Sequence, residues 1–271
     1  MSLLWLWVAL GLYSLGLLHA LVTVVARREA WFRAALAAIA LGFIFHFVSL
    51  VERALTSGRF PVTNIAEATS LFAFLITLGF LLVYWLYRTT SLSVFTFPIV
   101  FAMTLASALS QRPGGVVEPL LERRWVSAHI SLTLAGYTAL ILAFLAGLMY
   151  LMQERELKRR KPRAFYYRLP PLETVDRVGS LALALGFPFI TVGLVIGLVV
   201  AAGEWNAGWM GDPKVWFSFA MWVIYLLLIL ARFGVGWRGH KAALFSIVGL
   251  AMALATWGAN YLSENHYFLG H

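Results

Sequence analysis

Eight long stretches without a charged residue constrain this chain more than any other feature of its sequence. They cover residues 3–26, 34–51, 68–87, 92–111, 125–153, 178–203, 215–231 and 242–263. At 1.5 Å per residue, a helix of about 20 apolar residues crosses the roughly 30 Å hydrocarbon core of a bilayer. Backbone polar groups inside lipid must be paired within their own segment, so each stretch is expected to be helical. The sequence therefore predicts an all-α fold, a polytopic membrane helix bundle of about eight transmembrane helices.

Composition also favours lipid over water as the surrounding solvent. Apolar residues make up 61% of the chain and charged residues 12%, against roughly half and a quarter in soluble domains. The longest hydrophilic insertion, residues 154–177, is too short for a second domain. We therefore expect residues 1–271 to form a single integral membrane domain. The first stretch has no basic n-region and is too long for the apolar h-region of a signal peptide, which favours a retained span.

The distribution of basic residues predicts the orientation in the membrane. With the amino terminus outside, fifteen of the 21 Lys and Arg residues fall in inner loops and six in outer segments, as the positive-inside rule requires. Both termini and the loop 204–214 then face the extracytoplasmic side, and the loop 154–177 faces the cytoplasm. The inner excess of charge either only fixes the topology or also attracts anionic lipid headgroups, and it does not favour nucleic acid as a partner.

Three histidines are candidate metal ligands. His46 lies about twelve residues into the second stretch, and a polar ring at that depth is either a site or a side chain that is hydrogen-bonded across helices. His129 lies near the outer start of the fifth stretch, and His266 lies just beyond the outer end of the eighth. The chain contains no cysteine, so it supplies no thiol, disulfide or thiolate ligand.

Local patterns predict two helix starts and one close contact between helices. Asn64 and Glu67 have the spacing of a capping box, and Asp212 before a proline is typical of a helix start. Gly193 and Gly197 form a pair of small residues that lets the sixth span approach a neighbour closely. These signals describe packing and do not themselves indicate a function.

The most unusual segment is GEWNAGWMGDPKVW, between the sixth and seventh spans. Trp205 and Trp209 are four residues apart, so a helical turn would place both rings on one face. The tryptophans are either an aromatic belt at the membrane interface or, together with Trp216 and Lys214, a platform for a large flat ligand with anionic edges. Haem is such a ligand, because its macrocycle stacks on aromatics, its propionates pair with cations and its iron takes axial histidines.

This tryptophan-rich loop, with an outer histidine before it and another after it, resembles the CcsA-type cytochrome c assembly family, including its HemX-like branch. The segments Trp125–Leu151 and PVTNIAEATSLF (61–72) are also similar to the family, and the resemblance covers roughly residues 40–271. Three positions in and beside the loop depart from the family's pattern: Asn206, Gly211 and Val215. A loop altered in this way resembles that of the HemX-like branch of the family.

The resemblance implies that the chain handles a transiently bound b-type haem at the extracytoplasmic face of the plasma (inner) membrane. It implies iron ligation by His129, His266 and, within the membrane, His46. The other haem-binding residues that it implies are Trp205, Trp209, Asp212, Lys214, Trp216, Asn64 and Glu67. Haem would be delivered for covalent attachment to apocytochrome c, with other cytochrome c assembly membrane proteins as partners. The chain would then supply no catalytic residue and be at most part of a cytochrome c synthase system.

Two other functions fit the sequence. One is a HemX-like membrane regulator of haem biosynthesis without catalytic activity, in which the loop 154–177 contacts a cytoplasmic partner. The other is a secondary transporter of an amphipathic substrate. Such transporters tend to show internal repeats and interrupted helices, and the sequence has no clear inverted repeat.

Overall fold

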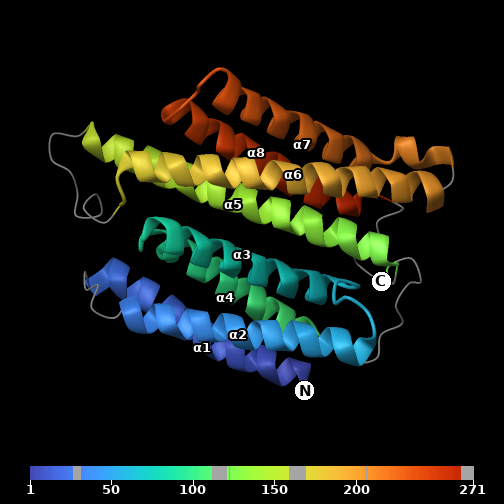
Figure 1. The fold of residues 1–271 in the computed structure, drawn as a ribbon, viewed down its shortest axis with the longest axis horizontal. Helices are drawn as coiled ribbons and strands as arrows, with labels where there is room; N and C mark the ends of the chain where they lie inside the picture. The colour runs from blue at the N-terminus through green and yellow to red at the C-terminus, as the bar shows by residue number, and fades with distance from the viewer. Residues whose placement is uncertain (27–31, 112–120, 122, 159–168, 205–206, 264–271) are drawn as a thin grey trace. The chain divides into compact units, whose positions relative to one another are not determined.

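The computed structural model describes residues 1–26, 32–111, 121, 123–158, 169–204 and 207–263 of the chain (Figure 1). Every long element in these residues is a helix, and eight of the helices are long and apolar enough to cross a membrane. The prediction of an all-α, multi-pass membrane protein is therefore confirmed. The helices cluster into two compact units, Met1–Ser127 and Ala128–His271. The single domain over 1–271, and the side of the membrane that each terminus faces, stay predictions.

Several helices continue beyond the charge-free stretches. The eight helices are α1 (Ser2–Ala26), α2 (Phe32–Ser57), α3 (Ile65–Tyr87), α4 (Leu92–Ser110), α5 (Arg124–Leu157), α6 (Leu172–Glu204), α7 (Pro213–Ile229) and α8 (His240–Gly258). Helix α2 extends past residue 51 because Arg53 finds a partner, Glu67, at 2.8 Å. Helix α5 extends past residue 153, where Glu154 pairs with Lys158 at 2.9 Å. The charge-free stretches of the sequence thus mark the parts of the helices that are suited to lipid. The helices themselves are longer, and charged residues in their extensions, such as Arg53 and Glu154, are paired.

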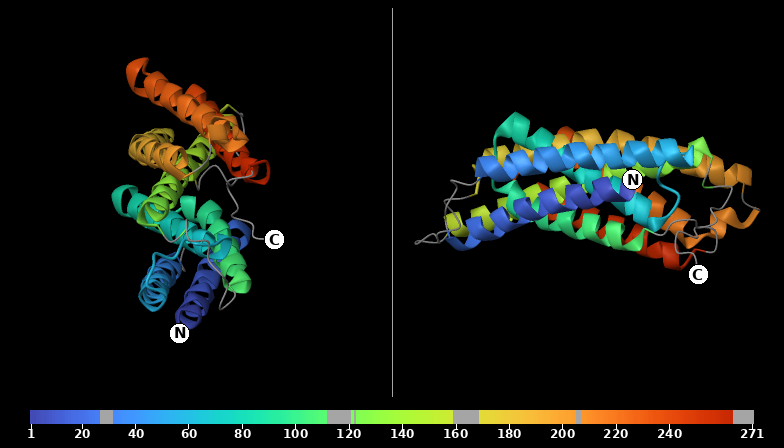
Figure 2. Two further views of the ribbon diagram at one scale, coloured as in Figure 1. Left: turned by 90° about the vertical axis from the view of Figure 1, so that its right-hand side faces the viewer. Right: turned by 90° about the horizontal axis from the view of Figure 1, so that it is seen from below.

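The first unit is a four-helix bundle. Helix α1 packs against α2 and α4, and α3 packs against α4 and α2, so the four helices close around a common core. The views in Figures 1 and 2 agree that they lie side by side along their length. Tyr13, Ile39, Phe80 and Phe97 are among the largest fully buried side chains of this core. The rings of Phe80 and Phe97 pack edge to face, with their centroids 4.9 Å apart. Aromatic pairs prefer this arrangement.

The second unit contains α5 from its second turn onward, together with α6, α7 and α8. Helix α7 packs against α6 and α8. Helix α5 approaches its neighbours at glycines: Gly136 lies against Ile190 of α6, and Gly147 lies against Ala243 and Ser246 of α8. Because glycine has no side chain, the backbones of these helices approach each other more closely than larger residues would allow.

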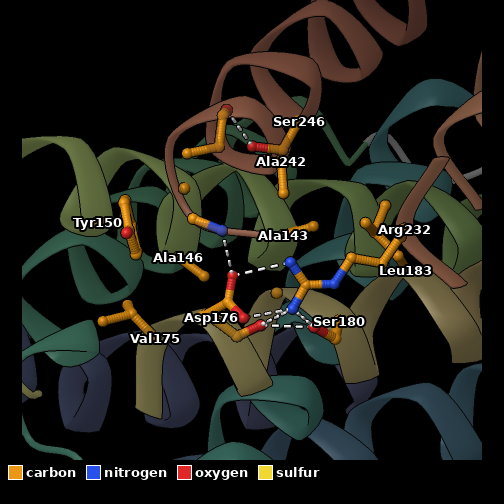
Figure 3. Close-up of a pocket in the computed structure, with 14 residues that line it drawn as sticks. Ala143, Ala146, Tyr150, Val175, Asp176, Ser180, Leu183, Arg232, Ala242 and Ser246 are labelled. Atoms are coloured by element: carbon orange, nitrogen blue, oxygen red, sulfur yellow. Dashed lines mark hydrogen bonds and ion pairs between the residues drawn. The ribbon is translucent and has the colours of Figure 1, made fainter. Parts of the chain in front are cut away.

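An ion pair fastens the connection between α7 and α8 to the start of α6. Helix α7 ends in a π-helical turn, Leu230–Gly234, which carries Arg232. Its guanidinium group donates from Nη1 to Asp176 Oδ1 at 2.8 Å and from Nη2 to Asp176 Oδ2 and Ser180 Oγ. The backbone N–H of Gly239, at a φ of 64°, donates to the same carboxylate at 3.0 Å. Figure 3 shows Asp176 and Ser180 facing the guanidinium group of Arg232.

A pocket with about 300 Å³ of empty space, including space open to solvent, adjoins this ion pair (Figure 3). Small side chains line most of it, among them Ala143 and Ala146 of α5 and Ala242 of α8. The charged oxygens of Asp176 are already engaged by Arg232 and Gly239. The pocket therefore offers a ligand mainly apolar walls.

Removing the carboxylate of this pair is expected to destabilise the protein strongly. The Arg232 side chain is only 8% exposed, so Asp176→Ala would leave a buried cation without its counter-charge and lower the free energy of unfolding by about 3 kcal/mol. Unfolding by SDS in mixed micelles, followed by circular dichroism, measures this loss.

The matched control is Glu173→Ala. Glu173 pairs with Arg177 on the same helix, but both side chains are well exposed, at 76% and 66%, so its removal should change the unfolding free energy by only about 0.5 kcal/mol. Similar losses in the two variants would mean that burial adds nothing to the Asp176–Arg232 pair.

Candidate functional site

His129 is half-buried on α5 and faces α6 of the same unit. Its Nδ1 lies 2.6 Å from the backbone oxygen of Gly193. A carbonyl oxygen only accepts hydrogen bonds, so Nδ1 carries the proton and, in the neutral ring, Nε2 carries the lone pair. None of the described residues forms a hydrogen bond with Nε2. Histidines that bind metals usually donate their other ring N–H to a carbonyl or carboxylate oxygen, as His129 does here.

Two glycines of α6 make this contact possible. The position that a Cβ would take on Gly197 lies 2.5 Å from Cε1 of His129 and 2.7 Å from its Nδ1. A Cβ on Gly193 would lie 2.9 Å from Oγ1 of Thr133, one turn along α5 from His129. The pair that the sequence indicated as a packing device therefore does bring α6 close to a neighbour, and the group that it accommodates is the candidate ligand.

Helix α7 begins as the sequence predicts. Asp212 is the N-cap residue, with Oδ1 accepting from the backbone N–H of Lys214 at 2.9 Å, and Pro213 occupies the first helical position. The second carboxylate oxygen accepts from the Ser263 hydroxyl at 2.6 Å. Asp212 is 5% exposed, and its bonds tie the start of α7 to the segment that follows α8.

Lys214 lies beside this cap and near His129. Its Nζ donates to Oδ1 of Asn260, and its side chain lies in the neighbourhood of the His129 ring. The second unit thus gathers an imidazole, an ammonium group and a capped helix start where α5 and α7 begin and α8 ends. Imidazole and ammonium groups are the side chains that bind the iron and the anionic edges of a haem-like ligand, so this end of the unit is the candidate site.

Two of the predicted tryptophans lie beside this end of α7. Trp209 is half-buried in a 3₁₀ turn, Ala207–Gly211. Trp216 is 63% exposed, and its Nε1 donates to the backbone oxygen of Met210 at 2.8 Å. This bond fixes the Trp216 indole against the 3₁₀ turn, so the ring is held in place although it is exposed.

His46 in the first unit has a different environment. It is fully buried, and both ring nitrogens have partners: the Tyr13 hydroxyl lies 3.3 Å from Nδ1 and the Ser70 hydroxyl 2.9 Å from Nε2. The rings of Tyr13 and Phe74 also pack against the imidazole in edge-to-face arrangements. In this structure His46 is thus hydrogen-bonded across three helices, which is one of the two alternatives that the sequence left open.

Asn64 and Glu67 build the start of α3. Asn64 Oδ1 accepts from the backbone N–H of Glu67 at 2.9 Å, which confirms the predicted cap. Glu67 is 2% exposed, and its two oxygens accept from Arg53 and from the backbone and hydroxyl of Thr63. The carboxylate reaches Thr63, one residue before the cap, rather than Asn64 itself as a capping box would. The contacts give both residues a structural role, and a role in binding a ligand stays a prediction.

The remaining predicted site residues, Trp205 and His266, lie outside the described residues. Sequence reasoning missed the partners that organise the site, namely the Gly193 carbonyl, Asn260 and Ser263. Asn260 and Ser263 could have been noticed in the sequence, because they are polar residues at the end of an otherwise apolar span. The Gly193 carbonyl could not, because every residue has a backbone carbonyl.

The comparisons with known proteins agree with the resemblance drawn from the tryptophan-rich loop. A family model described as "Cytochrome C assembly protein" matches residues 34–266, a range that includes every predicted site residue. The cytochrome c biogenesis protein CcsA of Prochlorococcus marinus subsp. pastoris is 27% identical over 256 residues, covering 84% of this chain and 80% of the relative. The protein of the same name from Microcystis aeruginosa is 25% identical over 270 residues, 82% of each chain. That of Atropa belladonna is 25% identical over 242 residues, 79% of this chain and 78% of the relative.

Asp212 caps α7 with one carboxylate oxygen and accepts from Ser263 with the other, so substitutions at Asp212 and Ser263 should affect the start of α7 differently. Asp212→Ala removes the cap of α7 and the bond to Ser263, so the amides of the first turn of α7 should exchange with solvent faster, by a factor of about five, consistent with a cap worth about 1 kcal/mol. Ser263→Ala keeps the cap and should leave those amides protected. Hydrogen–deuterium exchange with mass spectrometry over residues 213–220 measures both effects. Equal exchange in the two variants would contradict the assignment of Asp212 as the cap.

Proposed function

This chain belongs to the cytochrome c assembly protein family, and on that premise we propose that it holds haem at the extracytoplasmic membrane face for covalent attachment to apocytochrome c. Its own side chains bind and orient a transiently held b-type haem. Other cytochrome c assembly membrane proteins act with it in the plasma (inner) membrane. The proposal excludes a catalytic nucleophile on this chain, which has no cysteine.

The observation that carries the proposal is the tautomer of His129. Its Nδ1–H is donated to Gly193, and no described residue bonds to its Nε2. This is the arrangement in which an imidazole ligates iron, because the bonded nitrogen fixes the plane of the ring and raises the basicity of the other. His46, with a hydroxyl at each nitrogen, lacks such an open position.

The second proposed external ligand is His266. The Ser263 hydroxyl is bonded to Asp212 at the start of α7, and three steps along the chain span at most about 11 Å between Cα atoms. The proposal therefore needs His266 to reach, over this short length of chain, the end of the unit that holds His129 and Lys214. Ligation by two histidines would fill both axial positions of the iron and keep oxygen away from it.

The polar and aromatic residues around His129 are assigned roles by their contacts. Lys214 supplies the positive charge for a propionate. Trp209 and Trp216 offer ring faces, and the bond of Trp216 to Met210 lowers the entropy cost of holding that ring in place for a ligand. Asp212 acts as the anchor that keeps the start of α7 and the segment after α8 together.

The attachment reaction explains why positioning is enough. Each thioether forms when a cysteine S–H of the apocytochrome adds across a vinyl double bond, so sulfur and hydrogen both end on the product and no group leaves. Holding reduced haem with a vinyl group presented to the thiol is the contribution that a protein without a nucleophile can make. The excess of Lys and Arg in the inner loops supports an outward-facing site for this step.

Within the first unit, we propose His46 as a ligand that haem meets before it reaches His129. Ligation through Nε2 requires the Ser70 hydroxyl to move away, because it occupies that nitrogen at 2.9 Å. Asn64 and Glu67 contribute by fixing the start of α3, the helix that carries Ser70. The buried ion pair of Glu67 with Arg53 keeps that helix start in place.

The haem proposal predicts the absorption spectrum of the purified protein. Wild-type protein reconstituted with haem in nanodiscs should give the sharp Soret and α bands of six-coordinate, bis-histidine haem. His129→Ala and His266→Ala should each change the coordination, and the double variant should lose the Soret band at haem concentrations that saturate the wild type.

His240→Ala is the matched control for this experiment. His240 is exposed at the start of α8, where it pairs with Glu154 at 2.6 Å, so its loss should leave the haem spectrum unchanged. Wild-type protein that takes up no haem, or a double variant with an unaltered spectrum, would overturn the proposal. A haem-free protein whose function depends on the basic residues of 154–177 would favour the regulator.

Ligation by His46 has its own test in the His129→Ala, His266→Ala background. Adding Ser70→Ala removes the hydroxyl that occupies Nε2, so haem affinity at higher haem concentrations should rise about fivefold, the equivalent of one hydrogen bond. Adding His46→Ala instead should abolish this residual binding. Titrations followed by absorbance compare the three proteins. If the affinity is the same in all of them, His46 is a structural residue only.

A further inference from the structure

Two glycines of α6, Gly193 and Gly197, lie against His129 and the residues next to it on α5. At Gly197, the three nearest atoms to a built Cβ all belong to the His129 ring: Cε1 at 2.5 Å, Nδ1 at 2.7 Å and Nε2 at 3.4 Å. Carbon atoms in proteins do not approach ring atoms this closely. The imidazole therefore occupies the volume that a side chain at residue 197 would need.

At Gly193 the constraint falls on the backbone of α5. A Cβ there would lie 2.9 Å from Thr133 Oγ1 and 3.3 Å from the backbone nitrogen of Thr133. The Thr133 hydroxyl is itself held, because it donates to the backbone oxygen of His129 at 2.7 Å. Without a side chain at 193, α6 comes close enough for its own carbonyl to accept from His129 Nδ1 at 2.6 Å.

The two glycines thus act on different properties of the ring. Gly193 selects the tautomer, because its carbonyl accepts only from a protonated Nδ1. Gly197 selects the rotamer of the histidine side chain, because the missing side chain at residue 197 leaves space for the flat imidazole ring. Gly203, further along the same helix, has no atom of the described residues within 4 Å of its built Cβ, whereas a Cβ on Gly186 would lie 2.5 Å from that of Ala139, so some glycines of α6 are closely packed and others are not.

We propose that Gly193 and Gly197 are positioning residues for His129, which fix the tautomer and the direction of its Nε2 before any ligand binds. The proposal rests on the assignment of His129 as a haem ligand, and it adds the part of the chain that determines how this ligand is presented. Neither glycine touches the iron; both act through the imidazole.

Gly197→Ala is the sharpest test, because the three atoms nearest to the added methyl group all belong to the ring, which is able to rotate away while the helices stay packed. We expect the haem affinity of Gly197→Ala to fall at least tenfold, the scale of losses when the orienting partner of a metal ligand is removed. Gly203→Ala adds the same methyl group to the same helix in open space and should bind haem as the wild type does.

A second readout is independent of haem. In protein labelled with ¹⁵N-histidine, the nitrogen shifts of His129 report which ring nitrogen is protonated. The haem-free wild type and Gly203→Ala should show Nδ1–H with an unprotonated Nε2, and Gly197→Ala should show a mixture of tautomers. A purely structural glycine would change the unfolding midpoint without changing this signature.

Rescue by free imidazole completes the test. His129→Gly removes the ring and leaves room for imidazole, so added imidazole should restore the six-coordinate spectrum equally in His129→Gly and in the Gly197→Ala, His129→Gly double variant. Gly197→Ala protein with wild-type nitrogen shifts and wild-type haem affinity would overturn the inference. Altered nitrogen shifts together with a wild type that binds no haem would instead uphold the positioning by α6 and refute the haem-handling function.

Discussion

A polar group surrounded by hydrocarbon must find its partner inside the protein, and the structure depends on this constraint throughout. It makes every long described segment a helix. It also accounts for the bonds that hold the two units together internally: Arg53 and Glu67 in the first, Asp176 and Arg232 in the second. Where such partners exist, the helices continue past the charge-free stretches. Charged and polar side chains are therefore concentrated at the ends of the helices.

The same constraint separates two histidines that look alike in the sequence. His46 satisfies both ring nitrogens with hydroxyl groups from α1 and α3, so in this conformation it stabilises a bundle. His129 satisfies one nitrogen with a backbone oxygen of α6, and no residue in the described part of the chain bonds to the other. The two rings therefore differ in how many of their nitrogens have a described partner, and this difference is the basis for proposing His129 as a ligand.

Much of the fold was predictable because it follows from composition: the charge-free stretches located the eight helices, and Asn64 and Asp212 marked two helix starts correctly. The partners of the site were not predictable, because they depend on which helix faces become neighbours. The spacing of Gly193 and Gly197 indicated a close contact but not its partner, since nothing in the sequence relates residues of α6 to a histidine of α5. The resemblance to a family pointed to His129 as a ligand, and that role stays a prediction.

The hairpin of α7 and α8 is held differently at its two ends. At one end, Asp212 is bonded to Ser263 and Lys214 to Asn260, so the start of α7 is joined to the segment around the end of α8. At the other end, Arg232 and Gly239 are both bonded to Asp176 of α6, so the connection between α7 and α8 is joined to a third helix. Separating α7 from α8 would therefore break the bonds at the first end, and moving the hairpin as a whole away from α6 would break those at the second.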